Sequence, residues 1–196
     1  RLSKVRFFHI PTNECWARDH GPAFVQRTRR GTLETAIVDW GFNAWGGKYP
    51  PWDADDAVPT RVGEALGLPV FQAPIVMEGG AIDVNGEGTL LTTTSCLLNR
   101  NRNPGVSKAE IEDYLRAWYG QRHIVWLGEG IAGDDTDGHV DDLARFVGAR
   151  TIVTSIEAFD ARNRNILLMF GARKPGKPEL EEWRSIVASV EKQAAS

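Results

Sequence analysis

The chain has 196 residues, of which 42% are hydrophobic, and a formal net charge of −3. This composition supports a buried core in one domain or two, and it does not indicate binding to nucleic acid or to an anionic membrane. The sequence contains no apolar run near the roughly 20 residues that span a bilayer. Its two cysteines, Cys15 and Cys96, make no disulfide framework and are typical of a reducing compartment such as the cytoplasm.

The predicted elements begin with a β-strand over residues 5–10. The chain lacks an initial Met and enters this strand almost at once, so we expect it to be a piece of a longer protein. A helix is predicted over about 55–66, with Pro59 in its first turn and Gly67 after its end. A strand over 70–77 follows it.

A second helix is predicted to begin at the capping box of Ser107 and Glu110 and to end at Gly120. A strand over 123–127 follows it, and a third helix is predicted to begin at Pro178. The elements therefore alternate between pairs of strands and single helices, which indicates a mixed α/β fold.

The same order of elements occurs three times, beginning at Asp19, Glu78 and His139, which are 59 and 61 residues apart. Each copy has a polar leading residue, an apolar strand, a turn containing Gly and a second apolar strand. A period near 60 residues predicts repeated ββαβ units, of which the third lacks its final strand. Such units bury their apolar faces against their neighbours. We therefore expect the three leading side chains to point into one central site.

Each leading residue also has a purely structural interpretation. Asp19 beside Arg18 fits a surface ion pair, and Glu78 fits a turn at the end of a strand. The densest polar cluster surrounds His139, where His139 and Asp141 would share one face if this segment were a strand. That arrangement suits a general base beside a carboxylate that holds a cationic substrate.

Metal binding at this cluster is not expected. An EF-hand loop is excluded because position 133 is Gly and position 144 is Ala. A transition-metal site would need further His or Cys, and the other histidines share no ligand spacing with His139.

Five segments resemble the agmatine deiminases, which belong with the bacterial-type peptidyl-arginine deiminases in the pentein superfamily. They are WARDHGP (16–22), DWGFNAWGGKY (39–49), MEGG (77–80), LLNRNRNP (97–104) and GHVDDLARF (138–146). The resemblance covers residues 5 to about 160, and residues 163–196 follow it loosely. It implies an α/β propeller of five ββαβ blades, of which residues 1–196 would form about two and a half as a partial catalytic domain.

The resemblance also implies a reaction, the hydrolysis of agmatine to N-carbamoylputrescine and ammonia in putrescine and polyamine biosynthesis, without a metal or an organic cofactor. By motif matching, Asp19 and Asp141 would bind the guanidinium, which is charged at any ordinary pH and takes carboxylates well. His139 would be the general acid and base, Glu78 would orient His139, and Trp16 would pack along the substrate. The implied partner is a small guanidinium compound, and a homo-oligomer stays open.

The family nucleophile is a cysteine in a Gly-rich His-Cys segment, which attacks the guanidinium carbon to give a thiouronium. This chain does not contain that segment, and neither Cys15 nor Cys96 matches it. We therefore expect this polypeptide alone not to turn over agmatine. Two alternatives stay open: a peptidyl-arginine deiminase and a non-catalytic guanidinium-binding fragment. Agmatine lacks the α-carboxylate of arginine, so its binding needs no arginine facing that group, and the sequence does not say where Arg100 and Arg102 point.

Overall fold

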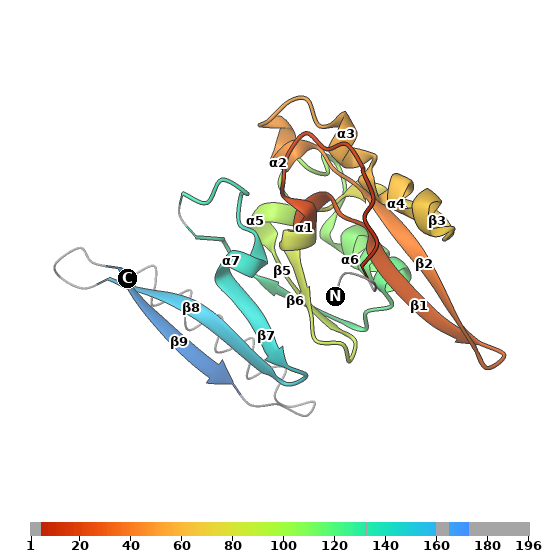
Figure 1. The fold of residues 1–196 in the computed structure, drawn as a ribbon. Helices are drawn as coiled ribbons and strands as arrows, with labels where there is room; N and C mark the ends of the chain where they lie inside the picture. Colours follow the sequence, from red (N-terminus) through yellow and green to blue (C-terminus); the bar gives the residue numbers. More distant parts are fainter. Residues whose placement is uncertain (1–4, 132, 160–164, 173–196) are drawn as a thin grey trace. The chain divides into compact units, whose positions relative to one another are not determined.

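The computed structural model describes residues 5–131, 133–159 and 165–172. Two units make up the chain, Arg1–Gly79 with Arg100–Val106, and Gly80–Asn99 with Ser107–Ser196. The elements in chain order (Figure 1) are α1 (Ala17–His20), β1 (Ala23–Arg29), β2 (Thr32–Gly41), α2 (Ala44–Gly47), α3 (Asp53–Asp56), α4 (Val58–Leu66), β3 (Val70–Val76), η2 (Gly79–Ala81), β4 (Ile82–Val84), β5 (Thr89–Thr93), α5 (Thr94–Leu97), α6 (Lys108–Tyr119), β6 (His123–Leu127), α7 (Val140–Leu143), β7 (Ala144–Gly148), β8 (Thr151–Phe159) and β9 (Asn165–Ala172).

The first unit contains one ββαβ repeat. Strands β1 and β2 form an antiparallel hairpin, and β3 lies parallel to β2 after the crossover through α4. Helix α4 begins with Pro59 in its first turn and ends at Gly67, whose φ of 66° is the left-handed conformation that glycine adopts readily. The predictions of this helix and of the following strand are confirmed.

The second unit repeats the topology in its first sheet, where β4 and β5 are antiparallel and β6 lies parallel to β5. Helix α6 carries the predicted capping box, with Ser107 Oγ accepting from the Glu110 amide and Glu110 accepting from the Ser107 amide. Its apolar side buries Ile111 and Leu115, and Gly120 ends it with a φ of 64°.

The third sheet departs from the prediction. Strands β7, β8 and β9 are antiparallel throughout, and no β9 was expected between the second strand and a helix at Pro178. The reason is length, because a parallel crossover needs about a dozen residues or more, whereas only residues 160–164 connect β8 to β9. The helix predicted at Pro178 lies outside the described residues. The propeller arrangement and the single partial domain therefore stay predictions.

Within the second unit, the two sheets share an apolar core that also includes α7. Its members are the buried Leu91, Val140 and Ala144 with the partly buried Val125, Leu127, Leu143, Phe146 and Ile152. Asp83 Oδ2 accepts from the Phe146 amide at 2.6 Å, and Asn85 Nδ2 donates to the Ala149 carbonyl at 2.8 Å. Successive repeats therefore bury apolar surface against each other, as expected for repeat proteins.

The N-terminal prediction was wrong, because residues 5–10 are not in a strand. None of the sheets in the described part of the chain includes this segment, and the side chain of Phe7 is 80% exposed. A β-favouring sequence forms a strand only where another strand offers its backbone groups. No helix in the described ranges has the length and apolar character needed to cross a membrane.

Candidate active site

The three leading residues occupy equivalent positions in the three repeats. Asp19 lies in α1, Glu78 directly precedes η2, and His139 is the N-cap of α7. They lie four, four and five residues before the first residues of β1, β4 and β7. Each leading residue therefore lies on or directly beside a helical turn that enters a hairpin.

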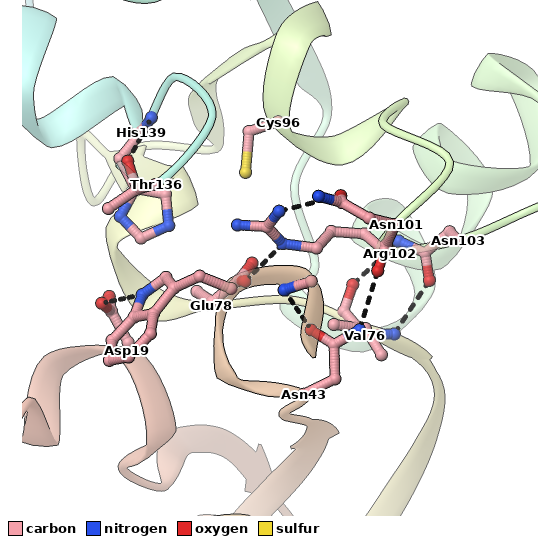
Figure 2. A network of polar contacts seen from close by, with 12 residues as sticks. Asp19, Asn43, Val76, Glu78, Cys96, Asn101, Arg102, Asn103, Thr136 and His139 are labelled. Carbon is pink, nitrogen blue, oxygen red and sulfur yellow. Dashed lines mark hydrogen bonds and ion pairs between the residues drawn. The ribbon is translucent and has the colours of Figure 1, made fainter. Parts of the chain in front are cut away.

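Asp19, half-buried in the first unit, is bonded to the aromatic loop that follows β2. Its Oδ2 accepts a hydrogen bond from Trp45 Nε1 at 2.9 Å (Figure 2). The Trp45 indole is buried and packs edge-to-face on Phe42 with ring centroids 5.3 Å apart. Trp45 has a φ of 56°, an uncommon conformation for a residue with a side chain. This loop belongs to the segment 39–49 that resembles the family, but the sequence did not predict the bond to Asp19.

Trp16, the predicted stacking residue, precedes α1 and is 59% exposed. Within the same unit, the backbone of Arg18 approaches the segment after Glu78, where a Cβ on Gly79 would collide with the Arg18 carbonyl oxygen. The glycine at position 79 therefore permits the turn after Glu78 to lie directly against the turn that carries Asp19.

Glu78 forms a buried ion pair that the sequence did not predict. Arg102 Nε donates to Glu78 Oε1 at 2.6 Å, and neither side chain is exposed to solvent (Figure 2). Arg102 Nη1 also donates to Asn101 Oδ1 at 2.9 Å. Asn103 is bonded twice to Val76, accepting from its amide and donating to its carbonyl, both at 2.9 Å. Residues 100–106 therefore hold both Glu78 and the strand end that leads to it.

One polar network joins these two parts of the first unit. Asn43 Nδ2 donates to the Asn101 carbonyl at 2.8 Å, and Asn43 Oδ1 accepts from the Gly46 amide at 2.9 Å (Figure 2). The Asn101 side chain lies against Gly46, so that a Cβ there would collide with it. The loop that holds Asp19 and the loop that holds Glu78 are therefore in direct contact, and both belong to segments that resemble the family, 39–49 and 97–104.

In the second unit, His139 is buried and lies beside Asp141, with 3.8 Å between Nδ1 and Oδ1. The segment is not a strand, because Asp141 lies in the first turn of α7. The predicted proximity of the two side chains still holds. Asp141 Oδ2 lies 3.7 Å from Arg145 Nη1, and Arg145 Nη2 lies 3.3 Å from Asp83 Oδ1.

Asp134 determines the backbone that carries His139. Its carboxylate accepts from the Thr136 hydroxyl and from the amides of Thr136, Gly138 and His139. Partial burial would raise the pKa of Asp134, but these hydrogen bonds to the charged form outweigh it and hold the pKa below its ordinary value. Thr93 Oγ1 donates to the Gly138 carbonyl, which secures the other side of the same peptide. These bonds turn the chain into a helical turn at His139, so the strand geometry considered for His139 and Asp141 does not occur.

The two cysteines differ in accessibility. Cys15 is exposed in the segment before α1, whereas Cys96 is buried in α5. The Cys96 sulfur lies within 4.8 Å of a ring nitrogen of His139. Cys96 is therefore placed beside His139 in a buried position, where a thiol commonly serves as a small apolar side chain.

Comparison with known proteins identifies the class. Residues 1–173 match the family model of the Porphyromonas-type peptidyl-arginine deiminase. A Shewanella sp. (strain MR-7) protein provisionally named an agmatine deiminase is 44% identical over 155 residues, which are 77% of this chain and 41% of that protein. The solved agmatine deiminase of Enterococcus faecalis is 38% identical with a TM-score of 0.69, over 78% of this chain and 42% of that one.

A cysteine-to-serine variant of C. jejuni agmatine deiminase, solved with substrate bound, is 35% identical with a TM-score of 0.72, over 84% of this chain and 48% of that one. These relatives are deiminases, enzymes that hydrolyse guanidino groups. The chain belongs to the Porphyromonas-type peptidyl-arginine deiminase family. It spans less than half the length of each of these three relatives.

Proposed function

We propose that this chain, as one partial catalytic domain, carries the guanidinium-binding part of an enzyme that hydrolyses agmatine to N-carbamoylputrescine and ammonia. The observation that carries the proposal is the equivalence of Asp19, Glu78 and His139 at the heads of successive repeats. A guanidinium is flat and permanently charged, so it is best bound by carboxylates that accept its N–H groups in its own plane. In this proposal Asp19 and Asp141 accept those bonds, and Trp16 packs along the substrate.

The proposed reaction has two steps. A cysteine thiolate attacks the guanidinium carbon, and the C–N bond breaks as His139 gives a proton to the departing ammonia, which leaves a thiouronium. Water then attacks the same carbon while His139 takes its proton, and the C–S bond breaks to release the ureido product and the thiolate. Glu78 orients His139 through both steps. No step requires a metal ion or an organic cofactor.

The thiolate is assigned to neither cysteine of this chain, and we therefore expect the purified 196-residue polypeptide to release no ammonia from agmatine. Ammonia release that His139→Ala abolishes would contradict this expectation. We also propose a reducing location such as the cytoplasm, because two cysteines make no disulfide framework.

The binding part of the proposal is tested by calorimetric titration of agmatine into the 196-residue chain. We expect saturable binding, weakened about tenfold or more by Asp19→Asn or Asp141→Asn, because a hydrogen bond to a charged group contributes about 1.5–3 kcal/mol. The matched controls are Asp53→Asn and Asp142→Asn, which change exposed carboxylates in the same two units. No binding by the wild-type chain, or equal losses in the controls, would refute the proposal.

The alternative substrate is peptidyl-arginine, which is the substrate in the name of the family. A blocked arginine peptide in the same titration distinguishes the two substrates. If the peptide binds more tightly than agmatine, peptidyl-arginine replaces agmatine as the proposed substrate. Saturable agmatine binding without ammonia release is also the result expected for a guanidinium-binding fragment.

A further inference from the structure

Arg102 and Glu78 form an ion pair with no exposed side-chain surface. A carboxylate and a guanidinium of this kind lose several kcal/mol of hydration each when they are buried, and a well-packed apolar pair would often be as stable. The stability of the first unit alone therefore does not require this pair. A role for it is indicated by Glu78, which heads the second repeat beside the turn that carries Asp19.

The guanidinium of Arg102 is itself fixed in direction. Nε donates to Glu78 Oε1 at 2.6 Å while Nη1 donates to Asn101 Oδ1 at 2.9 Å. These bonds use two edges of one rigid plane, so the rotation of the guanidinium is fixed and the Glu78 oxygen must follow it. A lysine ammonium can supply the charge but not this fixed angle between two donors.

The backbone under both partners is fixed by the same short loop. Asn103 binds both the amide and the carbonyl of Val76, two residues before Glu78. Asn101 receives the Asn43 side chain on its carbonyl. Residues 101–103 therefore determine the position of the strand end and the direction of the Glu78 carboxylate together.

We propose that Arg102 is a positioning residue that holds the Glu78 carboxylate in its working orientation, and that it is not a receptor for a substrate carboxylate. This inference rests on the proposed function, in which Glu78 acts at the guanidinium site. It also concerns specificity, because an arginine of this loop was the candidate partner for the α-carboxylate that arginine has and agmatine lacks. Arg102 is already committed to Glu78, whereas its neighbour Arg100 is exposed.

The test compares Arg102→Gln with Arg100→Gln, the exposed arginine two positions earlier. Removing one partner of a buried pair leaves the other charge uncompensated, so we expect Arg102→Gln to lower Tm by about 10 °C. Arg102→Gln should also weaken the binding of agmatine and of L-arginine by the same factor, about tenfold. Arg100→Gln should change neither Tm nor either affinity.

Two further variants separate positioning from folding. Glu78→Gln/Arg102→Gln removes both charges and should recover most of the lost Tm without recovering agmatine affinity. Arg102→Lys should fold and should bind agmatine with an affinity between those of Arg102→Gln and the wild type. These two variants decide the question even if Arg102→Gln fails to fold.

Three results would overturn the inference: a loss confined to L-arginine after Arg102 is changed, wild-type agmatine affinity in the double variant, or additive Tm changes for Glu78→Gln and Arg102→Gln. If the wild-type chain binds no guanidinium compound, the proposed function fails. In that case the melting temperatures of Glu78→Gln, Arg102→Gln and the double variant still show whether Arg102 holds Glu78. Non-additive changes in Tm support this role of Arg102, and additive changes refute it.

Discussion

Trp45 donates its indole N–H to the Asp19 carboxylate at 2.9 Å, which ties the head of the first repeat to the loop that follows its own hairpin. The loop is held in turn by Asn43 and by Asn101, the neighbour of Arg102. Two carboxylates of the first unit, Asp19 and Glu78, are therefore oriented by donors that come from segments far from them in sequence.

Trp45→Phe should separate the orientation of the Asp19 carboxylate from the packing of the ring at position 45. The phenyl ring keeps most of the edge-to-face contact with Phe42 but cannot donate to Asp19. We expect a small loss of stability and about a fivefold loss of agmatine affinity, which corresponds to ~1 kcal/mol for one lost hydrogen bond. Calorimetry and thermal unfolding measure the two effects. Trp52→Phe is the control, because Trp52 packs against the same cluster; equal affinity losses in both variants would contradict a role for the indole bond.

Gly46→Ala and Gly47→Ala form a matched pair. Both glycines have a positive φ, 88° and 81°, so each alanine introduces strain of about 1–2 kcal/mol. Only the Cβ at position 46 would collide with the side chain of Asn101, whereas the space around position 47 is open. Thermal unfolding should therefore show a loss for Gly46→Ala that exceeds that for Gly47→Ala by several degrees. Equal melting temperatures would show that Asn101 does not lie against this loop.

Asp134 should give stability that depends on pH. Its pKa in the folded protein lies below the ordinary value of 3.8, so its contribution is complete above that value and is lost as the pH falls through the lowered pKa. Asp134→Asn should cost about 1–3 kcal/mol at neutral pH, because several buried donors lose a charged acceptor. Urea unfolding should show this difference shrinking in strong acid. The exposed neighbour Asp135→Asn serves as the control, and a difference independent of pH would contradict the assignment.

The contribution of Asp39 to stability should change with pH in the opposite direction to that of Asp134. Burial, with a smaller repulsion from Asp56, raises its pKa above 3.8 despite the hydrogen bond from Thr60. A group with a raised folded pKa stabilises the fold most at pH values below its unfolded pKa, and this contribution is lost as the pH rises through the folded pKa. Asp39→Asn should therefore gain Tm relative to the wild type as the pH rises from acid to neutral. The exposed Asp53→Asn should show no such trend; a constant or falling Tm difference for Asp39→Asn would refute the sign.

Elements with strong local signals could be predicted from sequence. The capping box at Ser107, Pro59 in a first turn and glycines at the ends of α4 and α6 fixed two helices and their strands. The repeat period also placed Asp19, Glu78 and His139 in equivalent positions. The caps, the turn residues and the repeat period can all be read from the order of residues along the chain, so predicting them needs no knowledge of tertiary contacts.

Features decided by distant contacts could not be predicted. Arg100 and Arg102 occupy the same alternating Asn-Arg pattern, and only the fold buries one beside Glu78 and exposes the other. The helical turn at His139 depends on Asp134 and Thr93, which hold its backbone from outside the repeat pattern. The antiparallel β9 follows from the short connection to β8, and the apolar residues 5–10 form no strand because no described strand pairs with them.

An experimental structure of the chain with agmatine bound tests the proposed guanidinium site most directly. We predict that guanidinium nitrogens lie about 2.7–3.2 Å from carboxylate oxygens of both Asp19 and Asp141, with the His139 ring beside the same group. A structure in which Asp19, Glu78 and His139 face bulk solvent, or in which agmatine binds elsewhere, would contradict it.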